Sequence, residues 1–429
     1  MNPRSMGKLV MMLLLSFSLI VLFADSFRIL ILLVLSLVYE VNFPIGNFSV
    51  ILQDFILFGL LFSLLGKWSQ NPRMKWRWHP GDGFAFLLAL SGCVSLVAAS
   101  CKGWGSAWVI RQTTNLLEFI FLVLITERLV QTNKNLIVLG NCLVGTGILL
   151  AAYSLFCFIR AGGFDVVAQF SGTHILTRIR GGMDANNLAG FLDLLVPVGL
   201  TRFLTSKDQT ARLWFLTSSM IMLSVIILTL SRGSWIAQGL VLPSLFLGFK
   251  EFRKKIMVPI IITIGLLSLA SPMIIARIAP LFSYDPAAIG RIPLMFYAWK
   301  IFMLQPLWGV GFSNFAEVKF LYKFPLIWDP YRVCSAHNIY FELLVSLGFV
   351  GALAFILLVK VKIQSLRNIL RLEADGPMRG LVLGVLGSIS AFLIHGFVDS
   401  FLANPITLWM FAILLGMAGG LATSQMKRG

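Results

Sequence analysis

Two histidines stand where polar sequence meets a long apolar run, and they are the residues best suited to acid–base chemistry. His337 and Asn338 open the apolar part of "SAHNIYFELLVSLGFVG", and His395 and Asp399 are spaced i, i+4 in "HGFVD". An imidazole titrates near neutral pH and can take a proton from an incoming hydroxyl group. Simpler interpretations are a helix start at His337 and Asn338, and a structural polar pair at His395 and Asp399. If that pair forms, Asp399 orients the ring of His395.

Five arginines lie near the ends of apolar runs, on the side that the topology below places outside. Arg178 and Arg180 occur in "TRIRGGMDANN", Arg232 in "LSRGSW", Arg291 in "IGRIP", and Arg111 near the outer end of its own run. A guanidinium group matches phosphate oxygens, so several arginines facing one cavity would bind a phosphate or diphosphate. Alternatively, each arginine reaches lipid headgroups. That alternative suits Arg232 least, because it occupies a tight turn between two spans.

The sequence shows no pattern of metal ligands or of nucleotide-binding residues. The acids of the outer segments, Asp165, Asp184, Asp285 and Asp329, are scattered, whereas a divalent cation needs several oxygen ligands close together. The five cysteines form no C-x-x-C pattern, and there is no Walker motif. We therefore expect chemistry without a metal, a cofactor or ATP.

The composition is that of a helical membrane protein with many spans. Of the 429 residues, 58% are hydrophobic and only 12% are charged, and the mean hydropathy is +0.88. The apolar runs are too long and too even for the alternating strands of a membrane barrel. The net charge of +17 lies largely in short loops, as the positive-inside rule requires. Membrane lipids are therefore expected partners, and nucleic acid is not.

Placing the basic loops inside yields a self-consistent topology. The expected spans lie near residues 48–66, 82–99, 108–127, 136–159, 185–204, 213–230, 234–249, 256–276, 338–359, 379–398 and 405–424. Residues 9–41 count as one further crossing, which gives about twelve helices with both ends in the cytoplasm. The alternative is two short spans within 9–41 and an outside N-terminus. The fold class expected is an all-α, polytopic bundle.

Two segments of the single membrane domain 1–429 are expected outside, a smaller one at 160–184 and a larger one at 277–336. The larger segment is too long for a simple connection and is therefore a functional candidate. Part of it has the helical spacing of an amphipathic helix lying on the membrane surface, namely Ile292, Met295, Phe296, Trp299, Phe302 and Met303.

At this point the chain resembles a known family. "HNIYFELLVSLGFVG" is similar to the pattern of the O-antigen ligase and O-antigen polymerase superfamily, in which a histidine is followed by Asn, Ser or Gln and then by Gly-x-x-Gly. His337, Asn338, Gly348 and Gly351 fill its positions. Glycines at this spacing also let membrane helices approach closely, which would hold His337 on a rigid element. "RGGMDANNLAGFLDLLVPVG", "LSRGSW" and "GRIPLMFYAWKIFMLQPLWGVGFSNF" resemble further segments of the family in the same order.

The resemblance implies a GT-C-like glycosyltransferase of the bacterial inner membrane that works at the periplasmic face. Its donor would be a glycan linked to undecaprenyl diphosphate, bound by Arg180, Arg232 and Arg291, and His337 would face the acceptor hydroxyl. An O-antigen ligase, which joins the glycan to lipid A–core, is the interpretation we favour. The alternatives are an O-antigen polymerase and, in another class, an anion or bicarbonate transporter. The remaining candidates for substrate binding are Arg178, Asn338, Arg111, His395 and Asp399.

Overall fold

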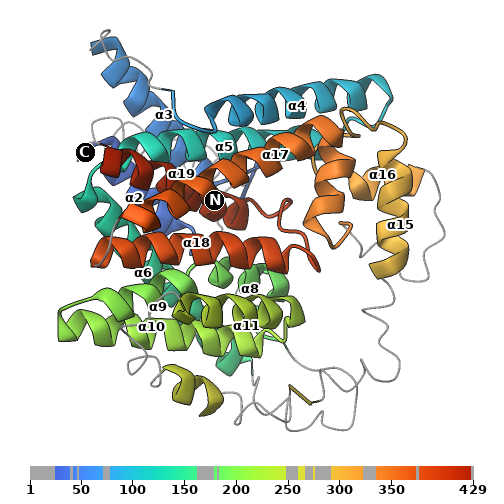
Figure 1. Ribbon diagram of the computed structural model, residues 1–429. Coiled ribbons are helices and arrows are strands. Elements are labelled where there is room, and N and C mark those ends of the chain that lie inside the picture. Colours follow the sequence, from blue (N-terminus) through green and yellow to red (C-terminus); the bar gives the residue numbers. More distant parts are fainter. Residues whose placement is uncertain are drawn as a thin grey trace, which may run out of the picture.

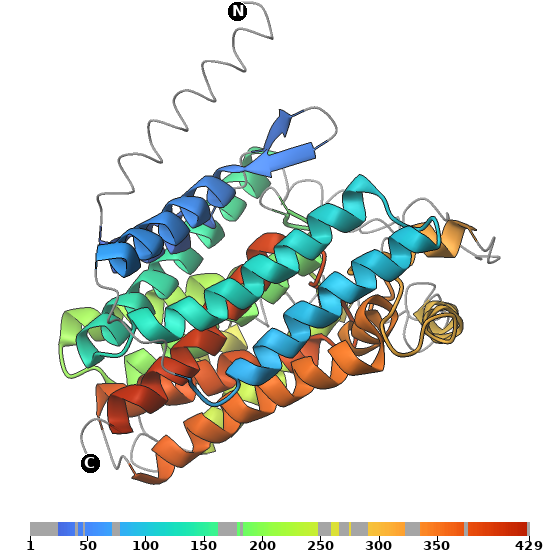
Figure 2. The same ribbon diagram turned by 90° about the horizontal axis from the view of Figure 1, so that it is seen from above.

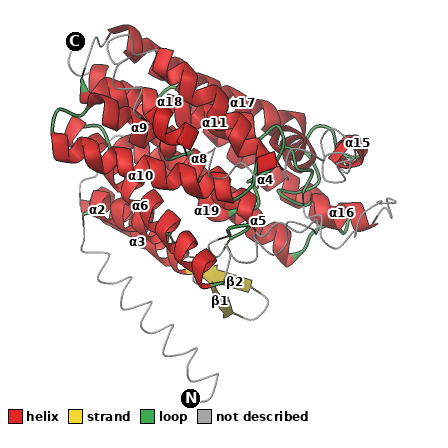
Figure 3. Ribbon diagram, turned by 90° about the horizontal axis from the view of Figure 1, so that it is seen from below, coloured by secondary structure: helices red, strands yellow, loops and turns green. Residues whose placement is uncertain are grey.

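The computed structural model describes residues 25–38, 42–45, 48–70, 78–161, 178–180, 183–247, 259–265, 274–275, 291–321, 335–372 and 376–426. Within these ranges the chain is helical apart from one antiparallel hairpin, which β1 (Asn42–Ile45) and β2 (Phe48–Ile51) form. Figure 3 shows this hairpin at one edge of the molecule. The helices are α2 (Ser26–Ser36), α3 (Leu52–Gln70), α4 (Asp82–Cys101), α5 (Ala107–Leu129), α6 (Asn133–Arg160), α8 (Ala185–Asp193), α9 (Val196–Thr205), α10 (Gln209–Leu228), α11 (Arg232–Leu247), α15 (Arg291–Phe302), α16 (Phe315–Leu321), α17 (Ile339–Leu372), α18 (Pro377–His395) and α19 (Pro405–Met426).

Eight helical segments of the described part are long and apolar enough to cross a membrane, which makes the chain a multi-pass helical membrane protein. They are Asp82–Cys101, Ala107–Leu129, Asn133–Arg160, Ala185–Thr205, Gln209–Leu228, Ile339–Arg371, Pro377–His395 and Pro405–Ser424. Each coincides with a span expected from the sequence.

The other four expected crossings are not among these eight. The span near 48–66 corresponds to α3, with 19 residues, and the span near 234–249 to α11, with 16 residues. The spans at 9–41 and 256–276 lie mostly outside the described residues. The number of twelve therefore stays a prediction.

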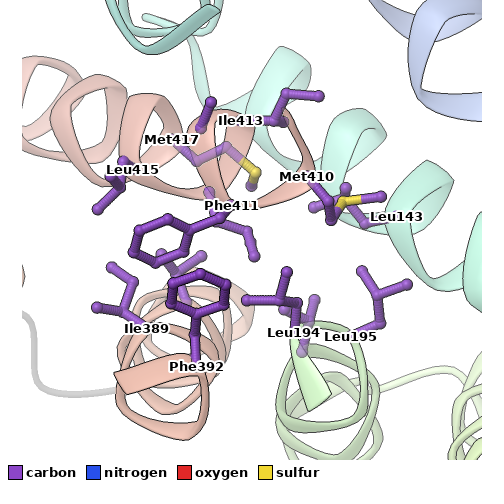
Figure 4. Packing of buried hydrophobic residues seen from close by; sticks show 14 of the residues in the cluster. Leu143, Leu194, Leu195, Ile389, Phe392, Met410, Phe411, Ile413, Leu415 and Met417 are labelled. Carbon is purple, nitrogen blue, oxygen red and sulfur yellow. The ribbon is translucent and has the colours of Figure 1, made fainter. Parts of the chain in front are cut away.

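The long helices lie side by side along a common direction (Figure 1), with α2, α3 and α6 forming a layer on one side (Figure 2). The helix α19 lies inside the bundle, where it packs against α5, α17 and α18. Its residues Leu408–Leu415 are all buried, as expected for a helix that is apolar on every face. In the core, Phe392 of α18 stacks on Phe411 of α19 with ring centroids 3.9 Å apart (Figure 4).

Helix α17 carries the two motif glycines, and they have different structural roles. A Cβ atom at Gly351 would lie 2.3 Å from the Ser91 hydroxyl of α4, so this glycine permits the close helix approach that the sequence predicted. Gly348 instead breaks the helix, because its φ of 65° and ψ of −170° are not helical. His337 therefore precedes a helix that is broken at Gly348. A Cβ at Gly348 would also lie 2.3 Å from the Leu307 carbonyl.

Residues 306–310 supply the hydrogen-bond partners that the break in α17 leaves open. The carbonyl of Pro306 accepts from the amide of Phe349 at 2.7 Å, and the amide of Val310 donates to the carbonyl of Val345 at 2.9 Å. Non-helical backbone is tolerated at membrane depth when its polar groups are satisfied inside the protein. The "LWGVGF" segment is thus joined to the helix that follows His337.

Helix α15 lies across the direction of the bundle, at the end where α17 begins (Figure 1). One face is buried in a satellite core together with Val310, Phe315 and Val345. The opposite face exposes Ile292, Phe296, Trp299 and Met303, which are 48–69% exposed. Phe302, expected on this outer face, is buried instead, because α15 is apolar on two sides and packs one of them on the protein.

Candidate functional site

Asn338 fixes the turn from which His337 projects. Its side-chain oxygen accepts hydrogen bonds from the amides of Tyr340 and Phe341, at 3.0 and 3.1 Å, and its amide group donates to the carbonyl of Phe397 at 2.8 Å. Asn338 is thus the N-cap of α17, and it is buried. His337 has a φ of 47°, in the left-handed region, so it lies outside the helix. The side-chain amide of Asn338 is thus occupied by hydrogen bonds within the protein. These bonds position the neighbouring His337.

The imidazole of His337 is paired with the carboxylate of Asp399. The Nδ1 atom lies 3.0 Å from Oδ1, and the His337 side chain is 32% exposed whereas that of Asp399 is 7% exposed. The same carboxylate oxygen accepts from the amide of Ser400 at 2.9 Å. A donor proton on Nδ1 leaves Nε2 as the basic nitrogen. A base oriented by a carboxylate is the arrangement that proton abstraction requires.

Asp399 carries a negative charge at neutral pH. Burial by itself raises the pKa of this carboxyl group, but the hydrogen bond and charge of His337, together with the charges of His395 and Arg291, lower it to about 2. An ionised partner both orients the imidazole and stabilises the imidazolium that forms when the ring accepts a proton.

The second oxygen of Asp399 begins a hydrogen-bonded chain that leads to Arg178. Oδ2 accepts from the side-chain amide of Asn186 at 2.5 Å, and Asn186 in turn accepts from the guanidinium of Arg178. The Nε atom of Arg178 donates to the carbonyl of Thr229 at 2.7 Å, at the end of α10. Sequence reasoning missed Asn186, although it lies in the quoted "TRIRGGMDANN" segment, since no local spacing relates it to Asp399.

The charges of three predicted arginines act on one another around this carboxylate. Burial lowers the pKa of Arg178, the charges of Asp184 and Asp399 raise it, and those of Arg180 and Arg291 lower it. Arg291 also acts on Asp399. These groups therefore lie within electrostatic range of one another. Positive charge of this density beside a histidine suits an anionic group with several oxygens.

Arg232 is the first residue of α11 and is partly exposed. The preceding Ser231 hydroxyl lies 3.2 Å from Nε2 of His395, a residue that ends α18. The tight "LSRGSW" turn expected from the sequence is thus present.

His395 and Asp399 are not hydrogen-bonded to each other through their side chains, contrary to the sequence prediction. The Nδ1 atom of His395 lies 2.7 Å from Oδ2 of Asp193, and the ring is 1% exposed. The amide of Asp399 still donates to the carbonyl of His395 at 3.2 Å, but the ring of His395 faces Asp193 and the carboxylate of Asp399 faces His337 and Asn186. His395 is enclosed by the protein and is not placed to contact a substrate.

Arg111 is paired with carboxyl groups of α3 and of its own helix. Its guanidinium lies 2.9 Å from Asp54 of α3 and 3.9 Å from Glu118 of its own helix. The hydrogen-bonded pair with Asp54 compensates the charge of Arg111 locally. The prediction that Arg111 binds substrate failed to anticipate this pairing, because Asp54 lies 57 residues earlier in the chain.

A comparison with protein families supports the resemblance that the sequence motifs indicate. Residues 217–356 match the model of the family described as O-antigen ligase. This match supports the resemblance to the O-antigen ligase and polymerase superfamily that the sequence motifs indicate. The matched segment includes Arg232, Arg291, His337 and the break in α17 at Gly348. No curated protein matches the chain.

The match to the O-antigen ligase family implies a glycosyltransferase-like enzyme and suggests lipid-linked glycan substrates in a membrane. Arg178, Arg180, Asn186 and Asp399 lie outside the matched segment. The tertiary structure brings Asn186 and Asp399 into hydrogen-bond contact, and Asp399 reaches His337 within the segment. The site thus joins the family segment to flanking helices.

Proposed function

We propose that the chain is an O-antigen ligase that transfers a glycan from undecaprenyl diphosphate to a hydroxyl of lipid A–core at the periplasmic face of the bacterial inner membrane. The observation that carries this proposal is the His337–Asp399 pair beside the charges of Arg178, Arg180 and Arg291. The histidine supplies a base for the acceptor, and the arginines supply a site for the diphosphate of the donor.

On the donor side, the reaction breaks the bond between the anomeric carbon and the diphosphate oxygen. Negative charge then grows on the diphosphate, and guanidinium groups already in place stabilise it. Arg180, Arg232 and Arg291 have this role in our proposal. Arg178 is tied to Asn186 and Thr229, so it adds charge and also anchors the chain that reaches Asp399. A diphosphate is a good leaving group, and the proposed step therefore requires no metal.

On the acceptor side, Nε2 of His337 takes the proton of the hydroxyl as its oxygen forms the new bond to the anomeric carbon. The electron pair of the broken bond leaves with the diphosphate, and direct displacement inverts the anomeric centre. Asp399 balances the positive charge that appears on the imidazole. Asn338 and Asp399 together determine the direction of the ring.

The proposed topology has about twelve crossings of one membrane domain, with segments 160–184 and 277–336 in the periplasm. Support comes from α15, which lies at the same end of the bundle as the start of α17 and of α11 (Figure 1). Its exposed apolar face would enter the outer surface of the bilayer. The basic residues Lys207, Arg212, Arg367 and Arg371 lie toward the opposite ends of their helices.

Glycan transfer by the purified protein tests the proposal. His337→Ala and Arg291→Ala should each abolish most transfer from a lipid-linked donor while the protein still accumulates in the membrane. Unchanged transfer in both variants would refute the mechanism. Cells that lack the gene distinguish the ligase from an O-antigen polymerase. Lipid A without O-antigen, with long lipid-linked chains accumulating, indicates a ligase, and a single repeat unit on lipid A indicates a polymerase.

The break in α17 bears on the alternative that the protein is an anion transporter. Transporters often coordinate ions with unwound backbone carbonyls in discontinuous helices. In α17, however, the carbonyl of Val345 accepts from Val310, and that of Ser346 accepts from the Ser95 hydroxyl at 2.6 Å. These carbonyls therefore already have partners from the protein. Glycan transfer in detergent, without a sealed vesicle, would exclude transport as the essential activity.

A further inference from the structure

A second histidine–aspartate pair lies buried behind the turn that carries Arg232. It consists of His395 and Asp193, whose side chains are at most 1% exposed. The pair is enclosed by α8, α11 and α18 and does not reach the surface where His337 is exposed. Its hydrogen-bond partners therefore show which part of the protein it holds.

The carboxylate of Asp193 holds the first two turns of α11. The Ser234 hydroxyl donates to Oδ1 at 2.5 Å, and Nε2 of Gln238 donates to the same oxygen at 2.9 Å. Ser234 and Gln238 are four residues apart and therefore share one face of the helix. Arg232 is the first residue of that helix, so a single buried carboxylate determines how the start of α11 is oriented.

A helix break presents Asp193 to α11. Pro197 has no N–H group, so the carbonyl of Asp193, four residues earlier, has no helical partner. The side chain of Gln238 also donates to this carbonyl, at 3.3 Å. The interruption between α8 and α9 is thus satisfied from α11, which adds a second bond between the same two residues.

The imidazole of His395 holds the turn from the other side. When Nδ1–H donates to Asp193, Nε2 accepts from the hydroxyl of Ser231 at 3.2 Å. A Cβ atom at Gly233 would lie 2.5 Å from Cδ2 of the ring, so only glycine lets the backbone approach this closely. Both sequence neighbours of Arg232 therefore contact one buried ring.

We propose that Asp193 and His395 are positioning residues that fix the direction in which the guanidinium of Arg232 points. This inference rests on the proposed function, in which Arg232 binds the diphosphate of the donor. Apart from Oε1 of Gln238, the side chains of this buried network are hydrogen-bonded to one another, and such networks favour one arrangement of their members. Removal of one member leaves a buried group unpaired and lets the turn shift, and a displacement of about 1 Å in a binding group costs on the order of a hundredfold in rate.

A double-mutant cycle tests whether the network acts through Arg232. The variants are Asp193→Asn, Arg232→Lys and the two combined, assayed for glycan transfer from a lipid-linked donor by the purified protein. We expect Asp193→Asn to lower kcat/KM by about tenfold to a hundredfold. Added to Arg232→Lys, it should cost less than about twofold more, since the same interaction is lost only once. If the fold-losses in kcat/KM of the two single variants multiplied in the double variant, the inference would be overturned.

If Asp193→Asn does not fold, the same test uses Ser231→Ala, alone and combined with Arg232→Lys. Ser231→Ala removes only the hydroxyl that faces His395, and it should lower kcat/KM by about three- to tenfold in the native background. It should have less than about twofold effect in the Arg232→Lys background. Equal losses in the two backgrounds would contradict positioning.

A matched control comes from the other buried network, at the opposite end of the bundle. Glu127 there lies 2.5 Å from Lys362 and 3.2 Å from His79. Glu127→Gln should lower the unfolding temperature about as much as Asp193→Asn does. It should not lower kcat/KM of the folded fraction. Normal transfer by both Arg232→Lys and His337→Ala would instead mean that the proposed function has failed, a result distinct from failure of the positioning role.

Discussion

Asp399 holds the ring of His337 from a position 62 residues further along the chain, with 3.0 Å between the carboxylate oxygen and Nδ1. Its other oxygen binds Asn186, which lies 213 residues earlier. One carboxylate thus joins the start of α17, the start of α8 and the turn after α18. The direction of the exposed imidazole depends on all three elements being correctly packed.

Asp399→Asn should lower kcat by at least about a hundredfold, because an amide neither balances the imidazolium charge nor selects the Nδ1–H form of the ring. Glycan transfer under saturating donor measures this effect. Asp208→Asn is a matched control, since Asp208 caps α10 through the amide of Ala211 and has no contact with His337. Equal activity of the two variants would remove Asp399 from the mechanism.

Protonation of Asp399 should lower the stability of the folded protein in acid. The pKa of Asp399 is lowered from 3.8 to about 2 in the folded protein, so its ionised form favours folding at every pH above about 4. This contribution, on the order of 2 kcal/mol, should disappear as the pH falls from about 4 to about 2. The unfolding temperatures of the wild type and of Asp399→Asn should therefore converge as the pH falls through that window. A constant difference in unfolding temperature would contradict the assignment.

Gly348→Ala should destabilise the protein by at least about 1–2 kcal/mol, because the left-handed backbone and the nearby Leu307 carbonyl both exclude a Cβ atom. Gly145→Ala is the control. Gly145 lies in α6 with nothing within 4 Å of an added Cβ, so alanine there should be neutral or stabilising by up to about 1 kcal/mol. Unfolding temperatures in detergent compare the two. Similar temperatures would mean that the break in α17 is not required.

Arg180→Gln should raise KM for the lipid-linked donor by about tenfold or more, since a charge-assisted contact to phosphate is lost. Arg111 offers the contrast, because its charge is already paired with Asp54. The double variant Arg111→Gln, Asp54→Asn removes that pair together and should leave donor KM within about twofold. If the double variant raised the KM for the donor as much as Arg180→Gln does, Arg111 would be assigned to the donor site.

The outer face of α15 should be in contact with lipid. A bimane label at Phe296→Cys, in a chain whose five native cysteines are replaced by serine, should be quenched by nitroxide lipids. A label at Lys102→Cys, in the exposed turn after α4, should be quenched less by lipid and more by aqueous iodide. The reverse order would exclude a membrane-surface position for α15.

Much of the fold followed from local sequence properties. Length and apolar character locate a membrane helix, and the distribution of lysine and arginine orients it. This is why eight expected spans coincide with the helices of the structure. The motif around His337 also indicated the resemblance that the family match supports, since its histidine and two glycines are close together in the chain.

Only the tertiary structure decided which partner each polar side chain has. Local spacing paired His395 with Asp399, yet these residues bind Asp193 and His337, across separations of 202 and 62 residues. The spacing of Gly348 and Gly351 predicted close packing, but the backbone of residues 306–310 occupies the position beside Gly348. A helix pattern states which face a residue occupies, whereas the group it meets there depends on how distant segments pack. The sequence alone therefore predicted eight spans of the structure and the candidate residues, and packing determined which polar side chains are in contact.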